Sequence, residues 1–245
     1  MDILGIDIGG SGIKGAIVDV TNGQLLTERH RIPTPKPATP GAVGKALAEL
    51  VNHFKWKGPI GATFPAIIRH NIAYSAANVH DDWIGTNDAD VIEQYTGCKA
   101  HVINDADAVG IAEQRFGGGK QYRGTVFLIT VGTGLGTALM VDGGIVPNTE
   151  LGHLILPKHG HAESFCSDAA RKRDDLKWKE WAKRFECYLA HLEHLFSPEV
   201  FVIGGGVSKK PEKFVKHLNI QTPVKMAELK NLAGIIGAAV IAEHG

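Results

Sequence analysis

The sequence has little cysteine and no long apolar run. Its 245 residues contain three cysteines, Cys98, Cys166 and Cys187, and no Cys-x-x-Cys pair. An odd number of scattered cysteines fits a reducing compartment better than a disulfide framework. No stretch of 18 apolar residues occurs, and the chain enters a strand-like run without a leader pattern. We therefore expect a cytoplasmic protein that is neither exported nor membrane-bound.

The chain also lacks an excess of charge of either sign. Lysine and arginine together number 26, as do aspartate and glutamate, so the formal net charge is zero. Proteins that bind nucleic acid or membrane surfaces commonly carry a cationic excess. We expect neither kind of partner, and anion binding must come from a local arrangement of donors.

The chain divides into two halves with the same order of predicted elements. In the first half we predict strands at 3–8, 15–20, 24–32, 60–64 and 101–103 and helices at 43–54, 89–95 and 106–116. In the second half we predict strands at 125–131, 137–141, from 144 onwards and 200–203, and helices at 176–196 and 233–243. This repeat predicts an α/β protein of two lobes, residues 1–116 and 117–245, with a cleft between them. The last helix is expected to pack back on the N-terminal lobe.

Two glycine-rich segments stand between the first and second predicted strands of their own halves. The first, Gly10–Gly15, matches Gly-x-Gly-x-x-Gly, but a strand follows it where a dinucleotide-binding fold requires a helix. No P-loop pattern occurs either. The second segment is Gly132–Thr137. Glycines let backbone N–H groups approach an anion, so the pair is expected to clamp one phosphate chain, with ligand-free turns as the alternative.

The phosphates of such a chain are expected at these two turns. The predicted contacts are Gly9, Gly10, Ser11, Gly12, Lys14, Thr133, Gly134 and Gly136. Asp7 ends the first strand and is expected to hold Mg²⁺ through water, because Mg²⁺ keeps most of its hydration shell. An aspartate that only caps the turn is the alternative.

A carboxylate stands at the end of another predicted strand. Asp105 follows an apolar strand and precedes a helix, and ligands of α/β sheets gather at the carboxyl ends of strands. It is our candidate for the base that activates a hydroxyl, with a simple helix N-cap as the alternative. Glu150 and His153 follow in the second half, and such side chains hydrogen-bond vicinal hydroxyls of sugars.

Six segments together resemble the ROK family of sugar kinases and repressors, within the actin, hexokinase and Hsp70 superfamily. They are Asp7–Lys14, Asn104–Ala106, Thr133–Gly136, Glu150–His153, Ile203–Ser208 and Gly237–Ala239. The resemblance implies the actin-like (ribonuclease H-like) fold of two lobes and a homodimer. It implies that Asp105 is the general base on the sugar O6.

The same resemblance implies roles for further residues. Asn104, Glu150 and His153 would bind the other sugar hydroxyls. Gly204, Gly205 and Gly206 would lie beside a nucleoside or an equivalent part of the donor.

The chain departs from that family at its zinc site. Most members carry closely spaced cysteines after the Gly-His pair, whereas this region contains one, Cys166. Zinc would need His153, His159 and His161 besides that cysteine, at an unfamiliar spacing, so no structural zinc is expected. Glu163 is the candidate for a further sugar-binding glutamate that the family places here.

The variant without zinc ligands resembles the polyphosphate glucokinases of that family. This implies transfer from inorganic polyphosphate, possibly alongside ATP, to O6 of glucose. A polyphosphate chain needs a cationic track, and a merely solvated helix face is the alternative for any run of charge. The candidates are Arg171, Lys172, Arg173, Lys177, Lys179, Lys183 and Arg184, with Lys120, Arg123, Lys209 and Lys210 elsewhere.

Other functions fit parts of the sequence. One is an ATP-only hexokinase or fructokinase-type kinase of the same family. Another is a sugar-sensing repressor, but such proteins carry a helix-turn-helix domain before the sugar domain, and this chain enters its first strand at once. A non-enzymatic actin-like ATPase would leave Glu150–His153 without a role.

Overall fold

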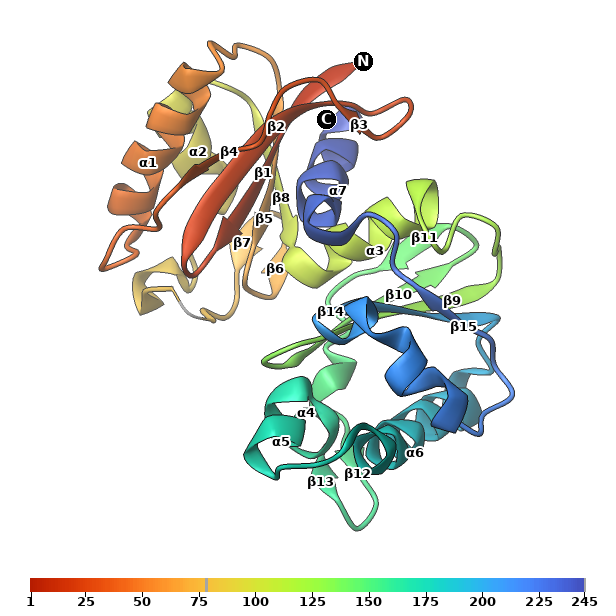
Figure 1. Ribbon diagram of the computed structural model, residues 1–245. Coiled ribbons are helices and arrows are strands. Elements are labelled where there is room, and N and C mark those ends of the chain that lie inside the picture. The colour runs from red at the N-terminus through yellow and green to blue at the C-terminus, as the bar shows by residue number, and fades with distance from the viewer. Residues whose placement is uncertain (78, 245) are drawn as a thin grey trace. The chain divides into compact units, whose positions relative to one another are not determined.

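The structure is a computed structural model that describes residues 1–77 and 79–244 (Figure 1). The chain forms two compact units. Unit 1 comprises Met1–Ala112 and Asn231–Gly245, and unit 2 comprises Glu113–Lys230. In the described part of the chain, no helix combines the length and the hydropathy that crossing a bilayer requires.

Unit 1 is built on a six-stranded sheet in the order β3-β2-β1-β5-β8, with β4 also paired to β2. Its strands are β1 (Asp2–Gly9), β2 (Gly12–Asp19), β3 (Gln24–Leu25), β4 (His30–Ile32), β5 (Ile60–Phe64) and β8 (Ala100–Asn104), besides the hairpin of β6 (Ile68–Arg69) and β7 (Ile72–Ala73). Its helices are α1 (Pro40–His53), α2 (Asp88–Thr96), α7 (Ala233–Ile241) and α3 (Asp105–Phe116), which continues into unit 2. Because β1, β5 and β8 are parallel, their carboxyl ends lie at one edge of the sheet.

Unit 2 is built on a five-stranded sheet in the order β11-β10-β9-β14-β15. The strands are β9 (Thr125–Val131), β10 (Leu135–Val141), β11 (Gly144–Val146), β14 (Val200–Gly205) and β15 (Val224–Met226), besides the hairpin of β12 (Ile155–Leu156) and β13 (Gly160–His161). The helices are α4 (Ala162–Cys166), α5 (Asp168–Arg173) and α6 (Trp178–Phe196). The long helix α6 buries Trp181, Phe185 and Tyr188 in the core of this unit.

The two sheets share one strand order, which confirms the predicted repeat. In each, the first strand pairs antiparallel with the second, and it pairs parallel with the strand that follows the first antiparallel strands, which is β5 in unit 1 and β14 in unit 2. The predicted strand at 24–32 is interrupted. Within these residues only the two short strands β3 and β4 pair with β2. The predicted helix at 176–196 begins at Trp178, where the Glu180 carboxylate accepts a hydrogen bond from the Lys177 N–H.

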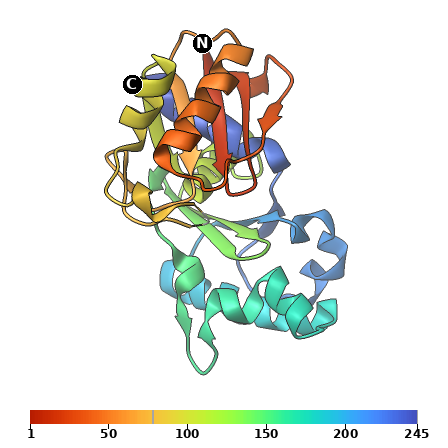
Figure 2. The same cartoon turned by 90° about the vertical axis from the view of Figure 1, so that its left-hand side faces the viewer.

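Local signals set the helix boundaries of unit 1. The hydroxyl of Thr39 caps α1, and Pro40 takes its first position, where the missing N–H costs nothing. The side chain of Asn87 caps α2, and Gly97 ends that helix at φ 71°. Figure 2 shows α1 (orange) in front of the first sheet and α7 (blue) behind it.

The helix α7 packs on the first sheet at backbone distance. It is apolar on all sides, and seven of its nine residues are buried. A Cβ on Gly61 of β5 would lie 1.7 Å from the Ala238 oxygen, and one on Gly237 would lie 1.8 Å from the Ala108 oxygen of α3. These contacts require glycine, because backbone atoms cannot move aside as a side chain can.

We predict that Gly237→Ala destabilises the protein, although alanine ordinarily favours a helix by about 1 kcal/mol. Overpacking against the α3 backbone costs about 1–3 kcal/mol and should dominate. Gly234→Ala in the same helix is the matched control, because its Cβ would meet only ordinary contacts at 3.5 Å. Urea and thermal unfolding followed by circular dichroism measure both variants. A Gly237→Ala protein that unfolds at or above the wild-type midpoint would contradict this packing.

A buried carboxylate lies in the first turn of α2. Asp88 is 1% exposed, and among the described residues neither of its side-chain oxygens has a hydrogen-bond partner. Burial raises the pKa of Asp88 to about 8. The unfolded chain ionises this group near its ordinary value, so between about pH 4 and pH 8 the folded state holds one more proton than the unfolded state.

The contribution of Asp88 to stability is therefore complete below about pH 4 and is lost as the pH rises to about 8, by up to about 1.4 kcal/mol per pH unit. Asp88→Asn removes this titration. Its melting temperature relative to wild type should increase steadily from pH 5 to pH 8. Asp90→Asn, an exposed position in the same turn, should show no such trend. Parallel pH dependence of wild type and Asp88→Asn would overturn the assignment.

Candidate functional site

The first glycine turn joins β1 to β2, as predicted. Gly9 pairs with Gly12 across the turn, and Asp7 pairs with Lys14. The Lys14 Nζ lies 2.9 Å from Asp7 Oδ2, and the Thr63 hydroxyl donates to Asp7 Oδ1 at 3.1 Å. The carboxylate is thus held from both neighbouring strands and faces Gly234 of α7, where a Cβ would lie 3.5 Å away. Among the described residues, no N–H group of the turn donates to the Asp7 carboxylate, whose donors are Lys14 and Thr63.

The second glycine turn joins β9 to β10 and is fastened from α4 and α5. The Gly132 N–H donates to the Gly134 oxygen at 3.0 Å, which closes the turn. The Leu135 N–H donates to Glu163 Oε2 at 3.0 Å, and the Ala169 N–H donates to the Gly132 oxygen at 3.1 Å. The residue predicted to bind sugar, Glu163, therefore holds the turn predicted to bind phosphate.

The segment with Glu150 and His153 rests on β10. Gly152 is buried, and a Cβ there would lie 2.0 Å from the Leu135 oxygen. The Leu151 N–H donates to the Thr137 hydroxyl at 2.9 Å. Both contacts attach this segment to the strand that leaves the second glycine turn.

Glu150 itself has an unusual backbone. Its φ of 40° lies in the left-handed region, which costs a non-glycine residue free energy and is common at functional sites. Its Oε2 lies 3.9 Å from His153 Nε2, and the histidine is exposed. The two side chains therefore point to the same place and are accessible.

Asn104 rather than Asp105 provides the helix cap of α3. The Asn104 Oδ1 accepts hydrogen bonds from the N–H groups of Ala106 and Asp107 at 2.9 and 3.1 Å. Its Nδ2 donates to the Ala66 oxygen at 3.0 Å, and the side chain is buried. Asp105 occupies the first turn of the helix, is exposed, and accepts from the Ala106 N–H at 2.9 Å. Asn104 is therefore the main cap of α3, and Asp105 accepts one of the same N–H groups.

The three successive glycines end β14 beside β9. Gly204 pairs with Thr130 and Gly205 with Val131, and the Gly206 N–H donates to the Val131 oxygen at 2.9 Å. Gly205 has φ 78°. These glycines lie at the same sheet edge as the second glycine turn, because β9 and β14 are parallel.

The residues considered for zinc have other neighbours. Cys166 is buried, its thiol donates to the Ala162 oxygen, and burial raises its pKa. His159 stacks on Phe165 with ring centroids 4.2 Å apart, and His161 Nδ1 lies 3.4 Å from the His153 oxygen. Across residues 1–77 and 79–244, no group of three or more metal-ligating side chains converges.

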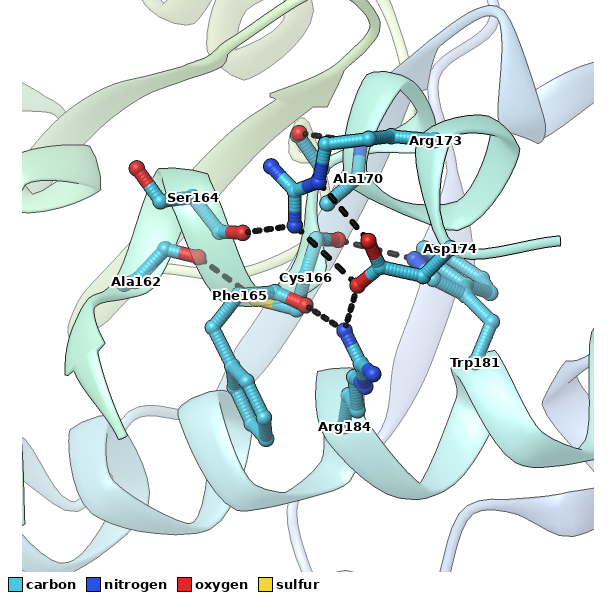
Figure 3. A network of polar contacts seen from close by, with 10 residues as sticks. Ala162, Ser164, Phe165, Cys166, Ala170, Arg173, Asp174, Trp181 and Arg184 are labelled. Carbon is cyan, nitrogen blue, oxygen red and sulfur yellow. Dashed lines mark hydrogen bonds and ion pairs between the residues drawn. The ribbon is translucent and has the colours of Figure 1, made fainter. Parts of the chain in front are cut away.

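Four of the seven cations predicted in residues 171–184 pair with acids, and Figure 3 shows the two that pair with Asp174. Asp174 accepts from Arg173 Nε at 2.7 Å and from Arg184 Nη1 at 2.6 Å. These two arginines hold the pKa of Asp174 at about 2. Arg171 and Lys172 both pair with Asp168 at 2.8 Å.

Figure 3 also shows what this pairing holds together. Arg173 donates to the Ser164 oxygen at 3.0 Å, and Arg184 donates to the Phe165 oxygen at 3.3 Å. The Trp181 indole N–H donates to the Cys166 oxygen at 2.8 Å. The run therefore fastens α4, the helix of Glu163, to α5 and α6.

Each unit gathers its predicted residues at the carboxyl edge of its own sheet. Unit 1 brings the first glycine turn and Asp105 to the ends of β1 and β8. Unit 2 brings the second turn, Glu163 and the glycines of β14 to the ends of β9 and β14, with Glu150 and His153 attached to β10. Two residues of the site, Arg31 and Thr63, escaped sequence reasoning, because strand register rather than spacing sets their neighbours.

Two sheets of one strand order, each with a glycine turn after its first strand, define the actin-like ATPase fold with two lobes, and 46% identity to a solved kinase of that fold places the chain among the sugar kinases. Residues 3–170 match the ROK family. The chain belongs to the ROK family.

The relatives agree with this membership. Polyphosphate glucokinase of Mycobacterium tuberculosis (strain CDC 1551 / Oshkosh) is 46% identical over 237 residues, which are 96% of this chain and 89% of that protein. The crystal structure of inorganic polyphosphate/ATP-glucomannokinase from Arthrobacter sp. strain KM is 46% identical, with a TM-score of 0.89 over 98% of each chain. A ROK family glucokinase from Streptomyces griseus, solved with glucose and AMPPNP, has a TM-score of 0.81 at 24% identity over 100% of both chains. That last likeness concerns the fold alone.

Proposed function

We propose that this protein transfers a phosphoryl group from inorganic polyphosphate or ATP to O6 of glucose. The observation that carries the proposal is 46% identity to a polyphosphate glucokinase across 96% of the chain. A polyphosphate/ATP-glucomannokinase matches equally well in sequence and over nearly the whole structure. Because that relative is named for mannose as well as glucose, mannose is the second candidate acceptor.

Asp105 acts as the general base in this proposal. Its carboxylate is exposed at the carboxyl edge of the first sheet, and Asn104 rather than Asp105 accepts from two N–H groups of α3. The carboxylate accepts the O6 proton as O6 attacks the terminal phosphorus of the donor. The bond from that phosphorus to the bridging oxygen breaks, and the shortened donor leaves. Glucose 6-phosphate is the product.

Residues of unit 2 recognise the remaining hydroxyls. Glu150 and His153 are accessible and share one location, so they supply an acceptor and a donor to neighbouring hydroxyls. Glu163 has a second carboxylate oxygen besides the one that accepts from Leu135. Asn104 is mostly committed to its backbone partners and contributes chiefly by orienting the base next to it.

The donor phosphates bind at the two glycine turns and beside Gly204–Gly206. Asp7 is the residue that would hold Mg²⁺ there, because a phosphate-bound magnesium ion retains waters and needs only one or two carboxylates from the protein. A carboxylate has more acceptor positions than Lys14 and Thr63 occupy. When bound, Mg²⁺ supplies positive charge to the phosphates.

Further proposals on the donor, the compartment, the partners and the assembly accompany this function. Seven cations against four acids in residues 168–184 leave a local positive excess for a polyphosphate chain, although four of the cations already have carboxylate partners. The protein works in the cytoplasm, and its partners are small molecules rather than nucleic acid or membrane. It forms a homodimer and holds no structural zinc, as the family resemblance and its departure at Cys166 imply.

We predict that purified protein with Mg²⁺ forms glucose 6-phosphate from polyphosphate and, in a parallel assay, from ATP. Coupled measurement of glucose 6-phosphate follows the reaction, and phosphate analysis of the sugar product serves for mannose. Turnover with ATP alone would remove polyphosphate from the proposal and leave the sugar chemistry intact. No turnover with either donor and either sugar would refute the function.

We predict that Asp105→Asn lowers kcat by at least about 10² with either donor, because the amide cannot take up the O6 proton. The matched control is Asp90→Asn, which also changes an exposed aspartate in the first turn of a helix. Melting temperatures of both variants report folding. An Asp105→Asn enzyme that keeps wild-type kcat would refute its assignment as the base.

A further inference from the structure

Four polar side chains form a row across the first sheet. Arg31 on β4 is in register with Lys14 on β2, Lys14 with Asp7 on β1, and Asp7 with Thr63 on β5. Residues in direct register project from the same face of a sheet, so their side chains are neighbours. The row crosses the sheet next to the first glycine turn.

This row carries more positive than negative charge. Two cations stand opposite each other, and like charges in register destabilise a sheet. Asp7 pairs with Lys14 at 2.9 Å, whereas no carboxylate within residues 1–77 and 79–244 pairs with Arg31. The arrangement therefore leaves one uncompensated cation beside backbone N–H groups that suit an anion.

The guanidinium of Arg31 lies over the turn itself. Its Nη2 donates to the Ser11 oxygen at 2.7 Å. A Cβ on Gly12 would lie 2.5 Å from its Nε and 2.6 Å from its Nη2, so the absent side chain of Gly12 makes room for the arginine. A guanidinium has five N–H donors, and the hydrogen bond to Ser11 uses one.

We propose that Arg31 binds a phosphate of the phosphoryl donor at the first glycine turn. The planar fork of the guanidinium matches two phosphate oxygens at once, which a lysine ammonium does not. Lys14 forms an ion pair with Asp7, so the positive charge that remains for a phosphate at this turn is that of Arg31. The inference rests on the proposed function in taking the turn as the donor site, and it adds a residue to that site.

Direct binding tests the proposal without requiring turnover. Inorganic tripolyphosphate is titrated into wild type, Arg31→Gln and Arg29→Gln, with heat as the signal and no sugar present. Arg31→Gln should weaken binding about tenfold or more, which is the usual loss for one charge-assisted hydrogen bond. Arg29→Gln removes an exposed arginine two positions away and should bind like wild type. Equal affinities of the two variants would overturn the proposal.

Kinetics and a double variant separate binding from a structural role. Arg31→Gln should raise KM for both donors, leave KM for glucose unchanged and not lower the melting temperature, because it removes one of two like charges in register. Gly12→Ala should weaken tripolyphosphate binding by displacing the guanidinium, and the double variant should be no worse than Arg31→Gln alone. Fully additive losses would show that Gly12 and Arg31 act separately and would contradict the proposed contact. If wild type binds tripolyphosphate but phosphorylates no sugar, the proposed function fails while the Arg31 titration still stands.

Discussion

The close approach of α7 to the backbone around it determines the arrangement of unit 1. The helix meets the sheet at Gly5 and Gly61 and meets α3 at Gly237, and none of these contacts leaves space for a side chain. One helix therefore fixes the distance between β1, which ends beside Asp7, and α3, which begins at Asp105. In the proposed reaction β1 leads to the turn that binds the donor phosphates, and α3 carries the base. The distance between these two elements must therefore stay constant. Backbone contacts provide this rigidity better than flexible side chains would.

Unit 2 achieves a comparable rigidity with hydrogen bonds. The second glycine turn has its ends held by Glu163 and by the N–H of Ala169, while Thr137 holds the segment of Glu150. A residue predicted to face the sugar is thus bonded to a loop predicted to face the phosphates. Movement of the Glu163 carboxylate towards a bound sugar would change the support of that loop, which couples the two halves of the proposed reaction within one unit.

The fold was largely predictable from the sequence, because apolar runs and glycine turns repeat in the same order in both halves. The short elements were not, since β15 and α4 have three and five residues and show no periodicity of their own. At the site, position in the sequence identified residues near the carboxyl ends of strands, such as Asp7 and Asp105. It could not identify Arg31 or Thr63, because their neighbours are set by strand register across the sheet. Nor could it show that Asp168 and Asp174 pair with arginines of the cationic run.

The placement of α7 also has a consequence for synthesis of the chain. Unit 2 consists of one continuous segment, residues 113–230, inserted between the two parts of unit 1. The ribosome thus completes the inserted segment before it makes Ala233–Ile241, the helix that covers one face of the first sheet. Until that helix emerges, the strands made first expose apolar surface to the cell. The helix that is synthesised last therefore covers the core of the sheet that is synthesised first. A chaperone that shields the apolar strands would act during the interval between the two.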